Sequence, residues 1–195
     1  MSTVIIKYNA GNIRSVLFAL ERIGVQAVVT DDVEMIKQAD RVIFPGVGEA
    51  SSAMNYLKNK GLDKILLSLQ QPVLGICLGM QLMCSVSEEN NTECLGIFEQ
   101  KVLRFPRVED VKVPQIGWNT IVDLKSSLFE GVKENDFVYF VHGYYVESCA
   151  DSIATTSYIN CYSSAICKNN FYALQFHPEK SGKTGEQILK NFMKL

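Results

Sequence analysis

In the first part of the chain, short continuous hydrophobic runs alternate with segments whose hydrophobic residues recur at helical spacing. Residues 4–6 form a short β-branched run, and after a polar loop at residues 9–12 apolar side chains recur at helical spacing up to Gly24. The run predicts a strand, and the recurrence predicts a helix that stops at the glycine. The same order continues with a strand expected at residues 25–30, a short helix at 33–38 and a strand at 41–44.

The next segment predicts a helix, a buried strand and a second helix. Residues 49–69 carry helical spacing broken at Gly61, residues 72–76 form an uninterrupted apolar run, and another helical pattern follows at residues 80–83. An apolar run without alternation is typical of a central strand that helices cover on both faces. Strands that alternate with helices in this way predict a parallel sheet.

The second half of the chain is richer in β patterns. Short β-rich runs separated by turns occur at residues 101–105, 137–141, 153–156 and 172–176. A final helical pattern at residues 185–195 has its apolar side chains on one face, and no repeat, low-complexity segment or linker divides the chain. We therefore expect an α/β sandwich that forms one domain over residues 1–195.

Composition and charge exclude several functional classes. The 195 residues are 47% hydrophobic and 21% charged, as in ordinary globular proteins. Nineteen Lys and Arg against 21 Asp and Glu give a net charge of −2, so no basic field is available to attract nucleic acid or anionic lipid. The first residues do not resemble a signal peptide, and no later apolar run is long enough to span a bilayer. We expect a cytoplasmic protein that binds neither nucleic acid nor membranes.

The chain contains six cysteines, at positions 77, 84, 94, 149, 161 and 167. They include no C-x-x-C pair, and a chain of this length does not need disulfides to hold its core together. We therefore expect free thiols. A free cysteine is by default a small buried apolar residue, so a candidate for catalysis needs a special sequence context.

Cys77 has such a context, because Gly75-Ile76-Cys77-Leu78-Gly79 lies between the apolar run and the following helix. This is the form of a nucleophile elbow, in which a sharp strand-to-helix turn exposes the nucleophile and small neighbours avoid steric clashes. The start of the helix favours a thiolate, and the N–H of Leu78 would point to where an oxyanion forms. The alternative is a structural cysteine in a tight turn, and this pattern alone does not decide between the two.

A cysteine nucleophile needs a base, and the chain has two histidines, His142 and His177. His177 follows a β-rich run and precedes Pro178-Glu179, so its imidazole is expected at a strand end with a carboxylate two residues away. Such a carboxylate fixes the tautomer and stabilises the imidazolium. Cys77, His177 and Glu179 thus form a candidate triad. His142 is the rival base, but no carboxylate adjoins it, and we expect it to be a packing or substrate-pocket residue.

A glycine-rich loop, Pro45-Gly46-Val47-Gly48, follows the third predicted strand. In a parallel sheet, loops after neighbouring strands gather at the same carboxyl edge, so this loop is expected close to Cys77. Its backbone N–H groups could stabilise an oxyanion, with Val47 or Gly48 as donor. The alternative is an ordinary connection between strand and helix; a phosphate-binding P-loop is excluded because no Gly-Lys-Ser/Thr follows.

Three motifs in combination resemble those of the class I, triad-type glutamine amidotransferases: Pro45-Gly46-Val47-Gly48, the segment from Gly75 to Gln81, and His177-Pro178-Glu179. The resemblance extends over essentially the whole chain and implies a flavodoxin-like three-layer sandwich with a central, mainly parallel sheet. Within this family, residues 114–119, 139–142 and 177–182 are similar to those of the glutaminase subunits of imidazole glycerol phosphate synthases.

This resemblance implies an activity and a partner. The chain would hydrolyse L-glutamine to glutamate and ammonia through a cysteine thioester, with no metal or other cofactor. The ammonia would pass to a separate cyclase subunit, a (β/α)8 barrel, which forms imidazole glycerol phosphate and AICAR in histidine biosynthesis. The expected assembly is a heterodimer.

The resemblance also assigns roles to single residues. Cys77 would form the thioester, His177 would move the protons and Glu179 would orient the imidazole. The remaining roles are an oxyanion hole of Gly46, Val47, Gly48 and Leu78, substrate contacts from Gln81, Glu89, Gly143 and Tyr144, and a partner interface with Trp118 and Lys180.

Some residues depart from the family pattern. Lys7 and the residues after it stand where an acidic residue and a glycine are usual, and Gly143 stands where a serine is common. The second departure removes a side-chain hydrogen bond to substrate but leaves the backbone donors. Because glycine tolerates several backbone states, we also expect the loop at residues 45–48 to rotate when the loaded partner docks.

Two other kinds of function stay open at this point. The chain could serve a different synthase or act alone as a cysteine amidase or peptidase, although it is too short to carry a synthase domain of its own, which favours a partner. It could also be a non-catalytic sensor or scaffold on the same fold. The joint presence of Cys77, His177 and Glu179 argues against a scaffold.

Overall fold

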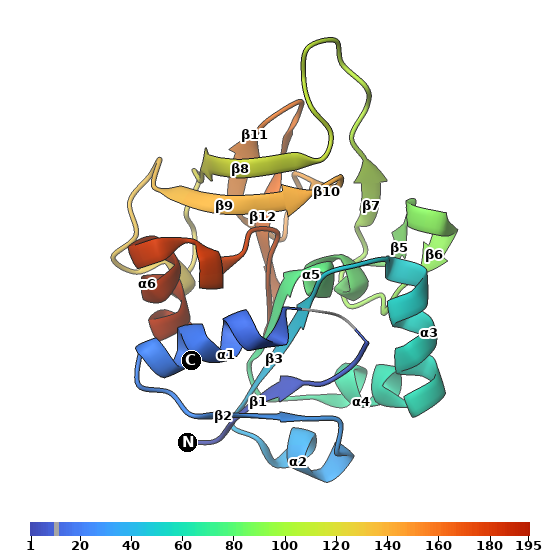
Figure 1. Cartoon of the computed structure of the whole chain (residues 1–195), viewed down its shortest axis with the longest axis vertical. Coiled ribbons are helices and arrows are strands. Elements are labelled where there is room, and N and C mark those ends of the chain that lie inside the picture. Colours follow the sequence, from blue (N-terminus) through green and yellow to red (C-terminus); the bar gives the residue numbers. More distant parts are fainter. Residues whose placement is uncertain (10–11) are drawn as a thin grey trace.

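A computed structural model describes residues 1–9 and 12–195, so the middle of the loop expected at residues 9–12 lies outside the described residues. Strands and helices alternate through the first half of the chain, as predicted. Gly61, with φ 68°, separates two helices where the sequence predicted a break. The elements, most of which are labelled in Figure 1, are β1 (Thr3–Ile6), α1 (Ile13–Arg22), β2 (Ala27–Thr30), α2 (Val33–Gln38), β3 (Arg41–Gly46), α3 (Ala50–Lys60), α4 (Leu62–Ser68), β4 (Val73–Cys77) and α5 (Leu78–Met83).

The second half is formed mostly of strands, as its β-rich runs predicted. Strands β5, β6, β8, β10 and β12 were not predicted. In β12, serines at positions 163 and 164 are buried among apolar residues, so this strand shows no clear alternation. The elements are β5 (Val86–Ser87), η1 (Glu89–Asn91), β6 (Thr92–Glu93), β7 (Lys101–Arg104), β8 (Gln115–Thr120), η2 (Ser127–Phe129), β9 (Phe137–His142), β10 (Tyr144–Glu147), β11 (Ser152–Ser157), β12 (Cys161–Lys168), β13 (Phe171–Leu174), η3 (Pro178–Lys180) and α6 (Gly182–Phe192).

The central sheet brings distant segments of the chain side by side (Figure 1). Its strand order is β2-β1-β3-β4-β13-β12-β10-β7-β5-β6, with β11 paired to β12. The strands from β2 to β13 are parallel, whereas the pairs β13–β12, β12–β10 and β10–β7 are antiparallel. The order β2-β1-β3-β4-β13 is that of flavodoxin-like folds. The predicted α/β class with a central parallel sheet is confirmed.

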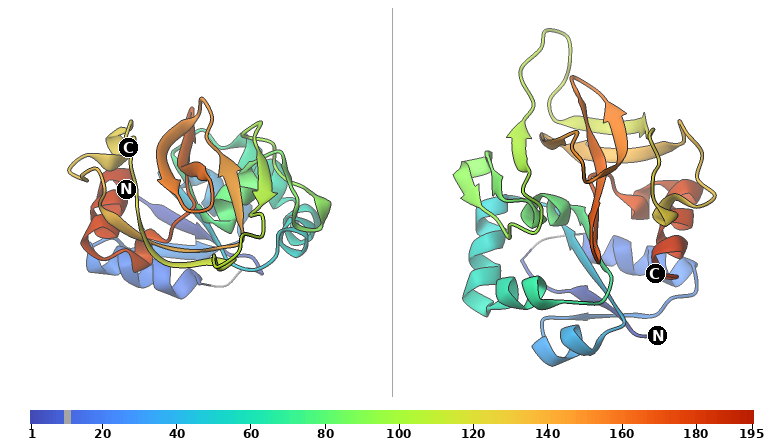
Figure 2. Two further views of the ribbon diagram at one scale, coloured as in Figure 1. Left: turned by 90° about the horizontal axis from the view of Figure 1, so that it is seen from above. Right: turned by 180° about the vertical axis from the view of Figure 1, so that it is seen from behind.

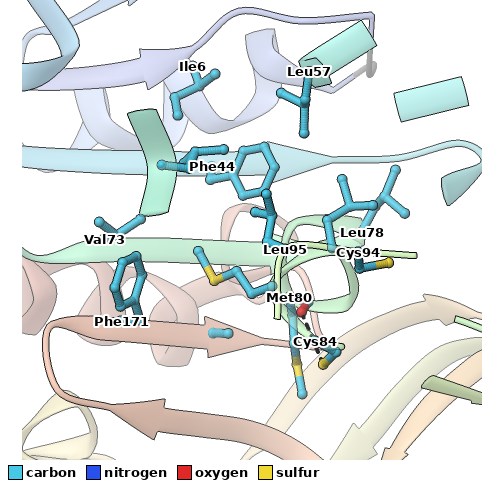
Figure 3. Close-up of a cluster of buried hydrophobic side chains, with 14 of the residues drawn as sticks. Ile6, Phe44, Leu57, Val73, Leu78, Met80, Cys84, Cys94, Leu95 and Phe171 are labelled. Atoms are coloured by element: carbon cyan, nitrogen blue, oxygen red, sulfur yellow. Dashed lines mark hydrogen bonds between the residues drawn. The ribbon is translucent and has the colours of Figure 1, made fainter. Parts of the chain in front are cut away.

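Both faces of the parallel strands are buried. Val4 and Ile6 of β1 face an apolar cluster that includes side chains of α2 to α5, whereas Ile5 faces a second cluster with α1 and α6. Figure 3 shows the first cluster, in which Phe44 and Phe171 come from strands far apart in the sequence. Helices therefore lie on both sides of the sheet, as the two views of Figure 2 show. Among the described residues, no helix is both long enough and apolar enough to cross a membrane.

Strands β8 and β9 pair with each other in a separate two-stranded sheet, and β9 contacts η3 and α6. Because side chains alternate along a strand, Val138 and Phe140 of β9 are buried in the core. On the opposite face, Phe137 of β9 and Ile116 and Trp118 of β8 are each more than half exposed. This sheet therefore presents an apolar surface to the outside.

The turn from β4 into α5 is packed tightly against β3. Cys77 has φ 53° and ψ −106°, a conformation that residues other than glycine rarely adopt. A Cβ atom on Gly79 would lie 1.9 Å from the carbonyl oxygen of Phe44, and one on Gly75 would lie 2.9 Å from Sδ of Met83. The two glycines that flank Cys77 are thus required by the close approach of α5 to the neighbouring chain.

Replacing Gly79 with alanine should therefore destabilise the fold by about 2 kcal/mol or more, because overpacking costs roughly that amount. Equilibrium unfolding in urea measures the change. Gly143→Ala is the matched control, since its Cβ would lie 3.8 Å from Cβ of Pro114, an ordinary contact. A Gly79→Ala protein as stable as the wild type would contradict the close approach.

Candidate functional site

A cavity of about 440 Å³ lies where β3, β4 and β9 end, next to the start of α5. Most of the predicted site residues line it, although they come from distant parts of the chain. Gly46, Glu179 and Trp118 lie outside this lining. The lining residues are Val47, Gly48, Cys77, Leu78, Gln81, Glu89, Arg104, Val113, Pro114, Val141, His142, Gly143, Tyr144, His177 and Lys180.

Cys77 enters this cavity from the end of β4. Its side chain is largely buried, and Sγ lies 3.7 Å from the carbonyl oxygen of Val141 and 3.8 Å from Nε2 of Gln175. In the parallel register, Cys77 stands opposite Gly46, the last residue of β3. The pairing of β3 with β4 therefore brings the glycine-rich loop to the sulfur, as expected for neighbouring parallel strands.

His177 is held in place through its main chain and its ring. Its N–H donates to the carbonyl oxygen of Tyr139 on β9 (2.9 Å), and its own carbonyl accepts from Oγ of Ser181 (2.6 Å). Nδ1 lies 2.8 Å from Oε1 of Glu179, which also accepts a hydrogen bond from the side-chain amide of Asn12. With Nδ1–H directed at the carboxylate, Nε2 is the ring atom left for Cys77.

The electrostatic surroundings favour a charged imidazole at His177. Burial alone lowers the pKa of His177, but hydrogen bonds to Cys77 and Glu179, together with the negative charges of these groups, raise it to about 10. The imidazole of His177 therefore binds a proton more tightly than the side chain of an isolated histidine does. This is the arrangement needed for a base that receives the proton of a thiol.

His142, the rival base, lies in a different environment. Burial lowers its pKa to about 4, so the ring is neutral near pH 7. Nδ1 lies 2.7 Å from the carbonyl oxygen of Tyr144, and Nε2 lies 3.2 Å from the hydroxyl of Tyr162. Both ring nitrogens therefore have partners within the protein, and the ring forms part of the cavity wall.

Strand β3 is packed closely at its end, and the loop that follows it is open. The hydroxyl of Tyr8 donates to the carbonyl oxygen of Pro45 (2.6 Å), and a Cβ on Gly46 would lie 2.2 Å from that hydroxyl. Gly48 has φ 113°, and a Cβ there would meet no described atom within 4 Å. Gly46 is thus fixed behind the cavity, while Val47 and Gly48 line it.

Polar groups gather at another part of the cavity wall. Nε2 of Gln81 donates to the carbonyl oxygen of Tyr144 (3.2 Å), which leaves the amide oxygen of Gln81 for a ligand. Oε2 of Glu89 accepts from the N–H of Ala50 at the start of α3 (2.7 Å), and burial raises the pKa of this carboxyl. Gly143 and Tyr144 form the corner between β9 and β10. These groups could hold the amino-acid end of a substrate.

Trp118 and Lys180 lie at the outer side of the site. Trp118 is 55% exposed, and its ring packs edge-on against that of Tyr139, with centroids 5.7 Å apart. Nζ of Lys180 lies 5.9 Å from the centroid of the same tyrosine ring. Lys180 also lines the cavity, so these side chains join the outer surface of β8 and β9 to the site.

Some residues of the site were not predicted from the sequence. Asn12 binds Glu179, Tyr8 binds the loop after β3, Gln175 contacts Cys77, and Arg104 lines the cavity. Asn12 stands at the N-cap position of α1, but its side chain makes no capping hydrogen bond and binds Glu179 instead. Gln175 could have been noticed as a polar residue inside an apolar run that ends at His177.

The chain is similar in sequence to known proteins over its whole length. Residues 4–195 match the family described as glutamine amidotransferase class-I. The chain is 60% identical over 196 residues to "Imidazole glycerol phosphate synthase subunit HisH" of Bacteroides fragilis, with all of both chains covered. It is 45% identical over 197 residues to the protein of the same name in Blochmanniella pennsylvanica, again with full coverage of both.

Solved structures show a similar fold at much lower sequence identity. PurLQS from Thermotoga maritima aligns with a TM-score of 0.72 and 14% identity over 99% of this chain and 97% of that chain. A crystal structure of a glutamine amidotransferase aligns with a TM-score of 0.71 and 16% identity over 98% of this chain and 97% of that one. At these identities the likeness concerns the fold alone.

The raised pKa of His177 predicts a pH-dependent contribution to stability. The contribution is complete below the ordinary histidine pKa of about 6.5, and it is lost as pH rises through the folded-state value of about 10. His177→Gln should therefore cost at least about 1 kcal/mol more unfolding free energy at about pH 6 than at about pH 10.5. Urea unfolding of both proteins at the two pH values measures this; the same loss at both would argue against a charged imidazole.

Proposed function

The chain belongs to the class I glutamine amidotransferase family, and from this premise we propose that it is the glutaminase subunit of imidazole glycerol phosphate synthase. As an enzyme, it hydrolyses L-glutamine to glutamate and ammonia for histidine biosynthesis. The observation that carries the proposal is the meeting of Cys77 and His177 in one cavity, with Glu179 bound to the far side of the imidazole. Full-length identity of 60% to a relative named for that synthase supports the choice of pathway.

In the first half of the reaction, His177 holds the proton of Cys77, and the thiolate attacks the side-chain carbonyl carbon of glutamine. The carbonyl oxygen becomes an oxyanion, which N–H groups of the Val47–Gly48 segment and Leu78, residues that line the cavity, would stabilise. When the oxyanion collapses, the carbon–nitrogen bond breaks and the imidazolium of His177 gives its proton to the departing nitrogen. Ammonia leaves, and a glutamyl thioester remains on Cys77.

In the second half, His177 takes a proton from water as the water oxygen attacks the thioester carbon. The carbon–sulfur bond then breaks, glutamate is released and the thiolate of Cys77 is restored. Throughout, Glu179 keeps Nδ1 protonated and so leaves Nε2 for proton transfer. Gln81, Glu89 and the Gly143–Tyr144 corner would hold the amino-acid end of glutamine away from the sulfur.

Two rival functions must be separated by experiment: a cysteine amidase that acts without a partner, and a scaffold without activity.

We propose that an oxyanion loop at residues 45–48 turns its N–H toward the substrate when the loaded partner docks. The fixed Pro45 carbonyl and the unobstructed, positive-φ Gly48 support a loop that moves at one end only. Ammonia would then form mainly when an acceptor is present to use it.

Glutamine hydrolysis by the wild type should rise about 100-fold or more when a cyclase with its ligand bound is added, the order of effect expected of an oxyanion donor. Cys77→Ala should show no turnover with or without the cyclase. Cys161→Ala, which removes an exposed thiol, is the matched control and should behave as the wild type. Turnover by Cys77→Ala would exclude the thioester route, and full activity of the isolated wild type would exclude the loop switch.

The outer face of β8 and β9 is the surface that we assign to the cyclase, a separate (β/α)8-barrel subunit in a heterodimer. Ile116, Trp118 and Phe137 are exposed there, and large apolar groups gathered on one face mark interaction sites. Lys180 links this face to the cavity that holds Cys77. Ammonia released in the cavity would have a short path to a partner bound to the outer face of β8 and β9.

We further propose that residues 1–195 work as a single amidotransferase domain in the cytoplasm. The family match spans residues 4–195 without interruption. All six cysteines are free thiols, as expected for a reducing compartment.

Trp118→Ala should weaken binding of the cyclase about tenfold or more, since truncation of a buried interface tryptophan often costs over 2 kcal/mol. Isothermal titration calorimetry measures the affinity. Leu67→Ala on α4 is the matched control, because Leu67 is a large apolar residue exposed on a different element. Equal losses of affinity in the two variants, or no loss in Trp118→Ala, would show that the cyclase does not bind to the outer face of β8 and β9.

A further inference from the structure

Gln175 is a fully buried polar residue beside the reacting sulfur, and the reaction described above does not use it. It follows β13 directly, and its main-chain N–H donates to the carbonyl oxygen of Ser164 (2.9 Å). Its side-chain Nε2 lies 3.8 Å from Sγ of Cys77. A buried amide requires partners for its oxygen and its nitrogen, so its placement next to a sulfur needs an explanation.

The direction in which the Gln175 amide points is set by a neighbouring backbone group. The carbonyl oxygen of Tyr144 can only accept a hydrogen bond, so the end of the Gln81 amide that meets it at 3.2 Å must be the nitrogen. The same nitrogen lies 3.1 Å from the Gln175 amide, so the atom of Gln175 that meets it must be the oxygen. The opposite end of the Gln175 amide, its NH2 group, therefore faces Sγ.

We propose that Gln175 is a further residue of the catalytic machinery, whose amide stabilises the thiolate of Cys77. A hydrogen bond to the charged form of a group favours that form, and a thiolate accepts a hydrogen bond better than a thiol does. The same donor favours departure of the sulfur when the thioester is hydrolysed. Gln81 and the Tyr144 carbonyl are the groups that hold the donor in this direction.

This inference rests on the proposed role of Cys77, but its test requires neither glutamine nor a partner. The test is the rate at which iodoacetamide alkylates Cys77 as a function of pH, read from the mass of the Cys77 peptide. Gln175→Met removes the donor while keeping the length of the side chain, and Gln175→Glu replaces the NH2 with an oxygen. In both, the pH midpoint of alkylation should rise by about one unit and the rate near pH 7 should fall about tenfold.

Gln38→Glu on α2 is the matched control for added charge, because Gln38 is exposed on a helix outside the cavity, and its midpoint should equal that of the wild type. Gln81→Met is an independent variant if both Gln175 variants melt early. Loss of the Gln81 NH2 frees the Gln175 amide to turn its oxygen toward Sγ. The pH midpoint of Cys77 alkylation should therefore rise in this variant as well.

An unchanged midpoint in folded variants at position 175, or in Gln81→Met, would overturn the role of Gln175. A merely structural glutamine would lower the melting temperature without moving the midpoint. A wild-type protein that fails to hydrolyse glutamine with the cyclase would instead overturn the proposed function, so the two failures can be told apart.

Discussion

The carbonyl oxygen of Phe44 on β3 approaches the backbone of Gly79 on α5 so closely that no side chain fits between them. This approach holds the turn from β4 into α5 against the neighbouring strand and keeps Cys77 at a positive φ. A strained residue persists only where its surroundings over-determine it, and here packing on both faces of the sheet does so. The direction of the sulfur, and so the position of the whole cavity, depends on this contact.

Strand β9 connects the cavity with the exposed apolar face of β8 and β9. The main-chain oxygen of Tyr139 accepts a hydrogen bond from the N–H of His177. The main-chain N–H of Tyr139 donates to Oγ of Ser181, and this hydroxyl in turn donates to the carbonyl oxygen of His177. The ring of Tyr139 points the other way, toward Trp118 and Lys180. A partner that pressed on the outer face of β9 would therefore act on the strand that positions the base. Coupling through one rigid strand needs no long pathway.

The fold was predictable from the sequence where its periodicity was strong. The helix at residues 33–38 has the predicted bounds, and the break at Gly61 lies where it was expected, because each depends on local spacing and on backbone freedom. Strand β8 was not predicted although Ile116 and Trp118 alternate with more polar positions, and β12 was not predicted because its apolar residues do not alternate cleanly. β12 buries Ser163 and Ser164, and the hydroxyl of Ser163 finds its partner on another strand, where it donates to the carbonyl oxygen of Glu147.

The sequence by itself determined the chemistry: a cysteine between two glycines, one histidine followed by a proline and a glutamate, and a glycine-rich loop after a strand. These motifs are local, and side-chain reactivity together with steric limits on the backbone gives them their meaning. Only the tertiary structure decided what surrounds them. Asn12 and Gln175 act through contacts between residues far apart in the chain, and burial keeps His142 neutral. Strand register and burial create those contacts, and no local pattern encodes them.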